Sequence, residues 1–282
     1  MNQFTNQDIA RYYDLSEVHY NLFWDLKKAR SLHYGYWTPG TKNFRQALVN
    51  INRVMADMAG IQPGSMVLDA GCGVGGSSLW LAKELNCRVT GISLNKNQVS
   101  KANGYAREAG LHDQVQFELK DYCNTGYAPN TFDIVWAIES VCYAGDKMDF
   151  IKEAYRLLKP GGRLIVTDFF KTADLKEKAS IAVKRMANGW AVNEFTTAEA
   201  FEQQLSEAGF SAITQHDASK AILPSARRLY RAWLIGKPFA WLYGMFNRNT
   251  TSLSKNNVHT AYLQYPTLKK GWWSYRIFTG EK

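Results

Sequence analysis

Several features of membrane, secreted and metal-binding proteins are missing from this 282-residue sequence. No apolar run approaches the ~20 residues that a membrane-spanning helix needs. The stretch from Met1 to Asp14 is polar and lacks the basic-then-apolar pattern of a secretory signal. The four cysteines show no C-x-x-C spacing, and the five histidines show no ligand-like spacing. We therefore expect a cytoplasmic protein with reduced thiols, no transmembrane segment and no metal site.

Internal repeats, low-complexity tracts and Pro/Ser-rich linkers are also lacking, which favours one globular domain with elaborations. We expect an N-terminal helical cap over residues 1–60 and a cofactor-binding core over 61–170. Residues 171–282 would then supply inserted lid helices and the final strands of the sheet. The net charge of +9 has two interpretations, a well-solvated surface or a site for nucleic acid or phosphate. Charge alone does not distinguish these two interpretations, and we favour the solvated surface.

Hydrophobic periodicity predicts strands that alternate with helices over about a hundred residues. Apolar runs typical of buried strands occupy 66–68, 88–92, 115–119, 132–138 and 163–168. Helical spacing occupies 5–30, 43–59, 77–85, 96–109 and 147–158. Beyond residue 170 the pattern weakens, with helices expected over 174–192 and 220–246 and strands over 210–214 and 272–279. The fold class that we expect is α/β, a doubly wound and mostly parallel seven-stranded sheet.

A glycine-rich turn follows the first predicted strand. Asp69 ends the apolar run, and Gly71, Gly73, Gly75 and Gly76 follow within seven residues before the next helix begins. Glycines let the chain turn tightly and bring backbone close to a ligand. In open α/β sheets the crevice beyond the carboxyl ends of the strands binds ligands. This turn is therefore the predicted cofactor site.

The kind of cofactor depends on where the acidic residue lies. The spacing also satisfies G-x-G-x-x-G, a weak indication of a dinucleotide, so an NAD-dependent oxidoreductase stays an alternative. Dinucleotide enzymes usually carry an acid ~20 residues further on, at the end of the second strand. Here that stretch, 91–95, reads Gly-Ile-Ser-Leu-Asn and has no carboxylate. Asp69 instead precedes the glycines, a position that suits a ligand with an ammonium group and no pyrophosphate.

Four stretches in register resemble a known family. Residues 67–76, Val-Leu-Asp-Ala-Gly-Cys-Gly-Val-Gly-Gly, resemble the first motif of class I S-adenosylmethionine (SAM)-dependent methyltransferases. Residues 91–99 and 136–140 (Trp-Ala-Ile-Glu-Ser) are similar to motifs of one subgroup. That subgroup contains sterol and tocopherol C-methyltransferases, cyclopropane synthases and antibiotic sugar O-methyltransferases. Residues 157–164 resemble the turn before the fifth strand of these enzymes. The resemblance covers about residues 33–170 and implies a Rossmann-like methyltransferase fold with SAM as cofactor.

The resemblance implies a role for each matching residue around the cofactor. The methionine portion of SAM would be surrounded by Asp69 and the backbone of Gly71, Gly73 and Gly75. The ribose would be reached by Gln98, with Ser93 and Leu94 lining that side.

The adenine and the transferring methyl would be held by other motifs. Asp121 would accept the adenine amino group, with Tyr122 beside the ring. Ala137 and Ile138 would form the floor under the methyl, and Tyr34 would close over the cofactor carboxylate. Each of these also has a plain structural interpretation, such as a surface acid for Asp121 or a core aromatic for Tyr34.

The catalytic residues are less clearly marked. Sugar O-methylating relatives carry a His-His pair after the 136–140 motif, but here Val141, Cys142 and Tyr143 follow. This departure favours sterol and isoprenoid C-methyltransferases, in which an alkene accepts the methyl and a carboxylate and aromatic rings stabilise a carbocation. By position, Glu139, Tyr143 and Asp168 are the candidates for the base.

The C-terminal part suits a lipophilic or anionic small-molecule acceptor. Its aromatic residues fall in two expected helices, where they could also serve core and lid packing: Tyr230, Trp233, Phe239, Trp241, Tyr243, Phe246, Tyr262 and Tyr265. Residues 227–233, Arg-Arg-Leu-Tyr-Arg-Ala-Trp, would hold an anionic headgroup, rest on a membrane or form a solvated face. C-methylation of an alkene is slightly preferred over O- or N-methylation. An RNA-modifying role is not favoured, because the N-P-P-[YF] motif and an extra RNA-binding domain are missing.

Overall fold

The computed structural model describes residues 4–24, 29–246 and 252–282, and it describes no side chains within 16–24, 236–246 or 252–259. The expectations on Phe239, Trp241, Tyr243 and Phe246 therefore lie outside the described side chains.

A seven-stranded sheet forms the centre of the molecule, with strand order β3-β2-β1-β4-β5-β7-β6. Its strands are β1 Met66–Ala70, β2 Arg88–Ser93, β3 Val115–Leu119, β4 Phe132–Ile138, β5 Leu158–Lys171, β6 Ser211–Asp217 and β7 Trp273–Glu281. Strands β1 to β5 pair in parallel, whereas β7 is antiparallel to both β5 and β6. This sheet confirms the predicted fold class.

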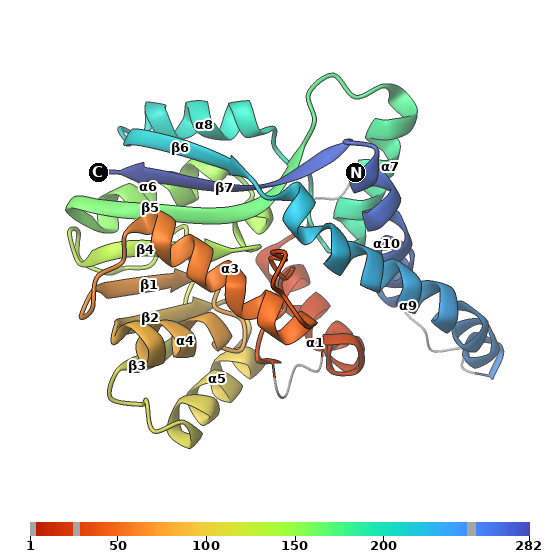
Figure 1. Cartoon of the computed structure of the whole chain (residues 1–282), viewed down its shortest axis with the longest axis horizontal. Helices are drawn as coiled ribbons and strands as arrows, with labels where there is room; N and C mark the ends of the chain where they lie inside the picture. The colour runs from red at the N-terminus through yellow and green to blue at the C-terminus, as the bar shows by residue number, and fades with distance from the viewer. Residues whose placement is uncertain (1–3, 25–28, 247–251) are drawn as a thin grey trace.

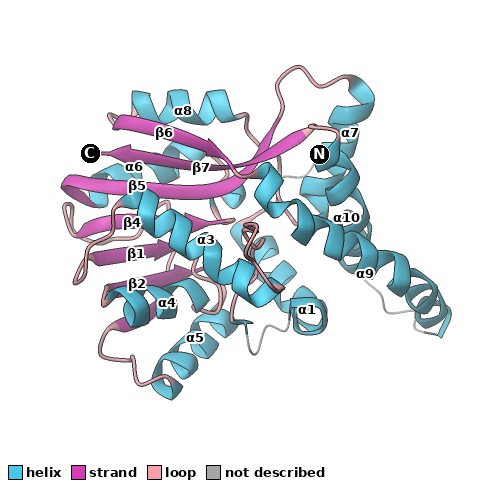
Figure 2. Cartoon of the chain, in the orientation of Figure 1, coloured by secondary structure: helices cyan, strands magenta, loops and turns pink. Residues whose placement is uncertain are grey.

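Helices cover both faces of the sheet (Figure 1, Figure 2). They are α1 Asn6–Trp24, α3 Phe44–Ala59, α4 Gly76–Leu85, α5 Lys96–Glu108, α6 Lys147–Leu157, α7 Glu177–Gly189, α8 Ala198–Glu207, α9 Ser219–Phe246 and α10 Ser252–Lys269, with a 3-10 turn, η1, at Val141–Tyr143. Among these, α8 and α10 lie outside the residue ranges that periodicity predicted as helical. No helix in the described part of the chain is long and apolar enough to cross a membrane.

Local sequence explains why the helices next to the sheet begin and end where they do. The Asn43 side chain caps α3 by accepting a hydrogen bond from the Gln46 amide, and Gly60 ends the helix in a left-handed conformation. The Asn95 side chain caps α5 in the same way by accepting from the Gln98 amide. Helix α4 follows β1 after the glycine turn, and α5 follows β2 after two residues, so both helices begin near the carboxyl ends of the strands that precede them.

Two apolar cores lie on opposite faces of the sheet, because side chains alternate along each strand. Val67 of β1 and Trp136 of β4 belong to one core, together with residues of α3, α4 and α5. Leu68 and Ala137 belong to the other core, together with residues of α6 and α8. The strand order reverses between β1 and β4, so the crevice outside their carboxyl ends is the expected ligand site.

Candidate active site

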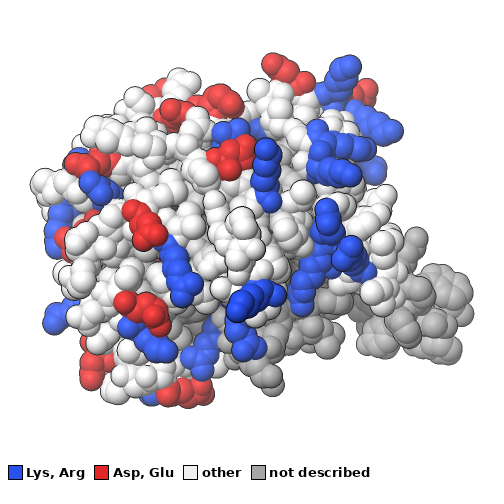
Figure 3. All heavy atoms as spheres, viewed as in Figure 1, with Lys and Arg blue, Asp and Glu red and all other residues white. Residues whose placement is uncertain are grey.

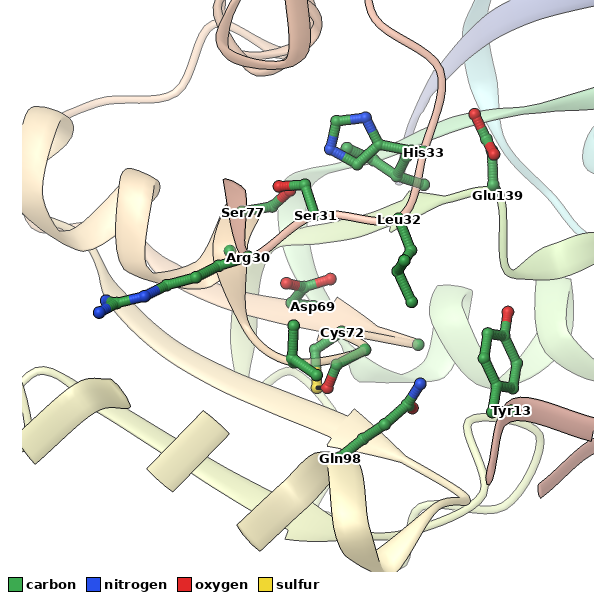
Figure 4. A pocket seen from close by; sticks show the side chains of 15 residues that line it. Tyr13, Arg30, Ser31, Leu32, His33, Asp69, Cys72, Ser77, Gln98 and Glu139 are labelled. Atoms are coloured by element: carbon green, nitrogen blue, oxygen red, sulfur yellow. Dashed lines mark hydrogen bonds between the residues drawn. The ribbon is translucent and has the colours of Figure 1, made fainter. Parts of the chain in front are cut away.

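A cleft lies at the carboxyl ends of β1 and β4. It encloses about 490 Å³, part of it open to solvent, and its walls come from Tyr13 of α1 and from four further segments. They are the glycine turn that follows β1, the start of α5, the end of β4 and the stretch 30–33 that precedes α3. Figure 4 shows Tyr13, Leu32, Asp69 and Gln98 pointing into this space, with Glu139 at its edge.

The glycines of the turn serve different purposes. A Cβ on Gly71 would lie 2.4 Å from the Ser140 Cβ, and one on Gly75 would lie 2.5 Å from the Phe117 ring, so both glycines permit close packing. A Cβ on Gly73 meets nothing within 4 Å, and Gly73 lines the cleft. All three have positive φ, at 90°, 87° and 55° for Gly71, Gly75 and Gly73. Gly73 therefore exposes backbone to a ligand, while Gly75 lies behind the turn.

Asp69 is a buried carboxylate on the wall of the cleft. Its Oδ2 accepts a hydrogen bond of 2.5 Å from the Ser78 hydroxyl at the start of α4. Burial raises the pKa of Asp69 to about 6, against the lowering effect of the Ser78 hydrogen bonds. A cation in the cleft would lower this pKa again, because an opposite charge favours the ionised form. The position suits the ammonium group of an amino-acid ligand.

A second compartment continues from the glycine turn along the ends of β2 and β3. Its walls include Ser93, Leu94, Asn95, Gln98 and Tyr122, together with Ile9, Ala10 and Tyr13 of α1. Ser93 donates a hydrogen bond of 2.9 Å to the Gln98 Oε1, and the Tyr122 hydroxyl donates one of 2.8 Å to the Ser140 carbonyl. The compartment joins polar groups to apolar and aromatic walls, as a nucleoside requires.

Asp121 takes a position that the sequence did not predict. It is absent from the walls of the described compartments. Its Oδ2 accepts a hydrogen bond of 2.8 Å from the Asn6 amide of α1, and its Oδ1 accepts one of 2.8 Å from the Cys123 backbone. Asn6 therefore occupies one acceptor site of the Asp121 carboxylate, and the contact with adenine stays a prediction.

A third compartment adjoins the cleft and shares Tyr13, Leu32 and Glu139 with it. Its described walls are mainly aromatic: Tyr13, Leu32, Tyr34, Glu139, Tyr143, Phe169, Trp190 and Gln264. The Phe169 and Trp190 rings lie 4.9 Å apart between centroids, and the Tyr13 and Tyr143 rings lie 5.8 Å apart. Glu139 supplies the one carboxylate among these described walls.

Glu139 lies where the first and third compartments meet, just after the end of β4. Its Oε1 accepts hydrogen bonds of 2.7 Å from the Tyr34 amide and from the Tyr275 hydroxyl. Its backbone φ of 49° is uncommon for a residue with a side chain and often marks a functional position. Burial raises the pKa of Glu139 to about 8, although both hydrogen bonds lower it. The site therefore contains a carboxyl group that exchanges a proton near neutral pH.

Besides Gly75 and Asp121, three predicted residues lie away from the positions expected for them. Tyr34 lines the third compartment rather than the glycine turn, and its hydroxyl bonds to the Gln264 side chain. Ala137 is fully buried in the core against α6, and Ile138 lines the cleft instead. Asp168 lines a smaller separate cavity with Lys147.

Asp168 contacts the backbone that carries Tyr143. Its Oδ2 accepts a hydrogen bond of 2.8 Å from the Cys142 amide. The Lys147 ammonium donates hydrogen bonds of 2.9 Å to the Cys142 carbonyl and 2.6 Å to the Ala144 carbonyl. Burial raises the pKa of Asp168 to about 6. Asp168 and Lys147 therefore hold η1, which presents Tyr143 to the second and third compartments.

Sequence reasoning missed residues from both ends of the chain. Tyr13 lines all three compartments, Tyr275 holds Glu139, and Trp190 and Gln264 form part of the third compartment. In the sequence, Tyr13 falls within the segment 5–30 that is expected to be helical. Tyr13 stands next to Tyr12 in an otherwise polar segment without a motif. The sequence alone therefore does not show which of the two tyrosines lines the site.

The parallel sheet, the glycine turn and the three joined compartments define an α/β enzyme that binds a nucleoside-containing cofactor beside an acceptor. Residues 68–166 match the family described as "Methyltransferase domain". The chain is 31% identical over 225 residues to 27-O-demethylrifamycin SV methyltransferase of Amycolatopsis mediterranei, covering 80% of this chain and 81% of that protein. It is also 31% identical to 2-methyl-6-phytyl-1,4-hydroquinone methyltransferase of Synechocystis sp., covering 86% and 75%.

A solved structure supports the same fold. The cyclopropane synthase MmaA2 from Mycobacterium tuberculosis superposes with a TM-score of 0.82 over 98% of each chain at 19% identity. This chain belongs to the class I SAM-dependent methyltransferases, and its cofactor is S-adenosyl-L-methionine. The alternatives of an NAD-dependent oxidoreductase and an RNA-modifying protein are not supported by these relatives.

Proposed function

We propose that this methyltransferase acts on a lipophilic small molecule without an anionic headgroup, and that the acceptor atom is a carbon of an alkene. The observation that carries the proposal is the third compartment. It is walled by aromatic rings, contains Glu139, and has no Lys or Arg among its described lining residues. A diphosphate or carboxylate buried there would lack a compensating cation among these residues, and it would meet a like charge whenever Glu139 is ionised.

The three parts of the chain divide the work in this proposal. The core, 61–170, holds the cofactor, with Asp69 and the Gly73 backbone at the methionine portion and Gln98 and Tyr122 at the nucleoside. The cap, 1–60, covers it through Tyr13. The C-terminal part, 171–282, completes the acceptor compartment through Trp190 and Gln264.

SAM supplies an electrophilic methyl group on a sulfonium. The chain's own contribution is to align the acceptor with that methyl and to exclude water, since an in-line displacement depends on distance and orientation. Phe169, Trp190 and Tyr143 place aromatic faces around the acceptor, and such faces stabilise a cation. The alkene electrons would form the carbon–carbon bond as the sulfur–methyl bond breaks, which would release S-adenosylhomocysteine and leave the positive charge as a carbocation on the acceptor.

Glu139 then has two tasks in the proposal. Its carboxylate stabilises the cation, and it accepts the proton that leaves the neighbouring carbon so that the alkene is restored. The hydrogen bonds from Tyr34 and Tyr275 fix the position of Oε1 for this step. Because the pKa of Glu139 is raised to about 8, activity should rise with pH as the carboxylate forms.

The test is to incubate the purified protein with SAM and matched acceptors, and to detect the products by mass. A prenylated alkene without a charged group should gain one methyl, whereas its diphosphate should react at least ~10-fold more slowly.

Glu139→Gln should lower kcat ~100-fold or more while S-adenosylhomocysteine still binds, because the cofactor contacts stay intact. Tyr36→Phe, whose hydroxyl contacts His216 outside the site, is the control. Methylation of a hydroxyl or an amine with the alkene unreacted would overturn the proposal.

A further inference from the structure

The net charge of the protein is concentrated in one region. Residues 218–280 contain ten Lys and Arg and no Asp or Glu. Since the chain has 34 basic and 25 acidic residues, the remainder carries 24 basic against 25 acidic and is nearly neutral. The whole excess of +9 therefore comes from the stretch that contains α9 and α10.

The helices α9 and α10 form a hairpin that extends away from the sheet (Figure 1). Aromatic rings hold the two helices together: Tyr230 lies 5.5 Å from Tyr265, and Trp233 lies 4.7 Å from Tyr262, between ring centroids. These four aromatic residues therefore serve packing between α9 and α10, as one of the two interpretations of the sequence expected. The opposite face of α9 is exposed to solvent.

That outer face of α9 is a single stripe of exposed residues. Its members recur at helical spacing: Pro224, Arg227, Arg228, Arg231, Leu234 and Ile235. Arg227 donates a hydrogen bond of 3.2 Å to the Tyr265 hydroxyl of α10, and Arg228 lies over the Phe44 ring of α3, so the first arginine is held within the hairpin and the second contacts the body of the protein. Leu234 and Ile235 lie further along the hairpin with 49% and 71% of their surface exposed.

Figure 3 shows Lys and Arg side chains crowded where α9 leaves the body of the molecule, with few acidic ones among them. Of the ten basic residues, Arg276 lies 3.7 Å from Asp217, at the base of the hairpin. Exposed aliphatic side chains beyond a row of arginines match an interface between water and acyl chains, since the cations contact anionic headgroups and the aliphatic groups enter the boundary below. A nucleic acid would satisfy the arginines but would leave Leu234 and Ile235 in water.

We propose that the outer face of α9 docks this methyltransferase on an anionic lipid surface. Docking itself does not depend on the acceptor proposed above. If that acceptor is lipophilic, the hairpin would also bring its source close, because α10 contributes Gln264 to the third compartment and packs on α7 through Thr260, whose hydroxyl bonds to the Met186 carbonyl.

The test is co-sedimentation of the full chain with vesicles of phosphatidylcholine alone or with about 30% phosphatidylglycerol. The bound fraction should rise at least ~5-fold with the anionic lipid and fall at about 0.5 M salt, where charges are screened within a few ångströms. Leu234→Ser with Ile235→Ser, and separately Arg231→Glu, should each reduce binding at least ~5-fold.

Matched controls replace similar residues elsewhere on the surface. Met66→Ser changes an exposed apolar residue at the amino end of β1, and Arg107→Glu changes an exposed basic residue of α5. Both should bind vesicles as the unchanged protein does. All variants should keep their melting temperature and their affinity for S-adenosylhomocysteine, which separates a docking defect from misfolding and from failure of the cofactor site.

Three outcomes would overturn the proposal. One is no gain with anionic lipid, and another is equal binding by the α9 variants and the unchanged protein. The third is a different occupant: a dimer that Leu234→Ser with Ile235→Ser dissociates in size-exclusion chromatography, or binding to an RNA oligonucleotide in place of vesicles.

Discussion

Gly73 differs from the other glycines of the turn because its missing side chain faces the cleft. At Gly71 and Gly75 an added Cβ would meet Ser140 and Phe117, whereas at Gly73 it meets nothing within 4 Å. A larger residue at Gly73 would therefore leave the packing of the turn intact and fill the space that the cofactor requires. It would also adopt a left-handed backbone, which costs ~1 kcal/mol.

Replacing this one residue should affect the cofactor more than the fold. We expect Gly73→Val to raise the dissociation constant of S-adenosylhomocysteine at least ~10-fold, measured by titration calorimetry, and to lower stability by ~1–2 kcal/mol. Gly104→Ala in α5 is the control, because its Cβ also meets nothing and its backbone is helical. It should bind normally and gain ~0.5–1 kcal/mol. Normal affinity in Gly73→Val would show that the turn does not contact the cofactor.

At the scale of elements, α1 lines the cleft and is hydrogen-bonded to the start of α5. The Asp14 carboxylate accepts hydrogen bonds of 2.9 Å from the side chains of Asn95 and Asn97 at the start of α5. The Ala10 carbonyl accepts a further bond from Asn95. These contacts place Ile9 and Tyr13 over the second compartment, so α1 covers the space that we propose for the nucleoside.

Loosening that cover should weaken cofactor binding while the core stays folded. Asp14→Ala removes two hydrogen bonds that join α1 to α5, and we expect a 3- to 10-fold (roughly) higher KM for SAM with a small change in melting temperature. Asp113→Ala, an exposed acid in the loop before β3, should leave KM unchanged. An Asp14→Ala enzyme with the same KM would mean that α1 is already open during turnover.

The predicted elements of the core agree with the structure because each is set by local periodicity. The strand expected over 132–138 is β4, and the strand expected over 115–119 is β3. The helix α8 was not predicted, since only Ala198, Phe201 and Leu205 in it are buried and its other positions read as a polar segment. These three residues recur at i, i+3 and i+7, so the helical pattern is present but short, and the helix packs against α6, β6 and β7.

For the whole molecule, buried titratable groups make stability depend on pH. The pKa of Glu139 is raised to about 8 from an ordinary value of 4.5, so the folded protein holds a proton that the unfolded chain releases. Stability therefore falls as pH rises between these values. His33 acts in the opposite direction at lower pH, because burial lowers its pKa to about 4 from 6.5. Asp69 and Asp168, each with a pKa of about 6, act in the same direction as Glu139 but mainly below pH 6.

Between pH 6.5 and 8, the pH dependence of stability therefore comes mainly from the titration of Glu139. We expect the melting temperature to fall as pH rises through this window, with a slope of at most ~1.4 kcal/mol of stability per pH unit. In Glu139→Gln the slope should become nearly flat, because the amide does not titrate. Asp113→Asn should retain the original slope. A slope that persists in Glu139→Gln would assign the proton to another buried group.

The sequence by itself determined the alternation of strands and helices, the glycine turn and the acid before it, because these depend on contacts between near neighbours in the chain. The tertiary structure alone decided which side chains line the three compartments. Tyr275 meets Glu139 across 136 positions, and Asn6 meets Asp121 across 115. Such pairs carry no local periodicity, since they arise only when β7 enters the sheet beside β5 and α1 folds over the ends of the central strands.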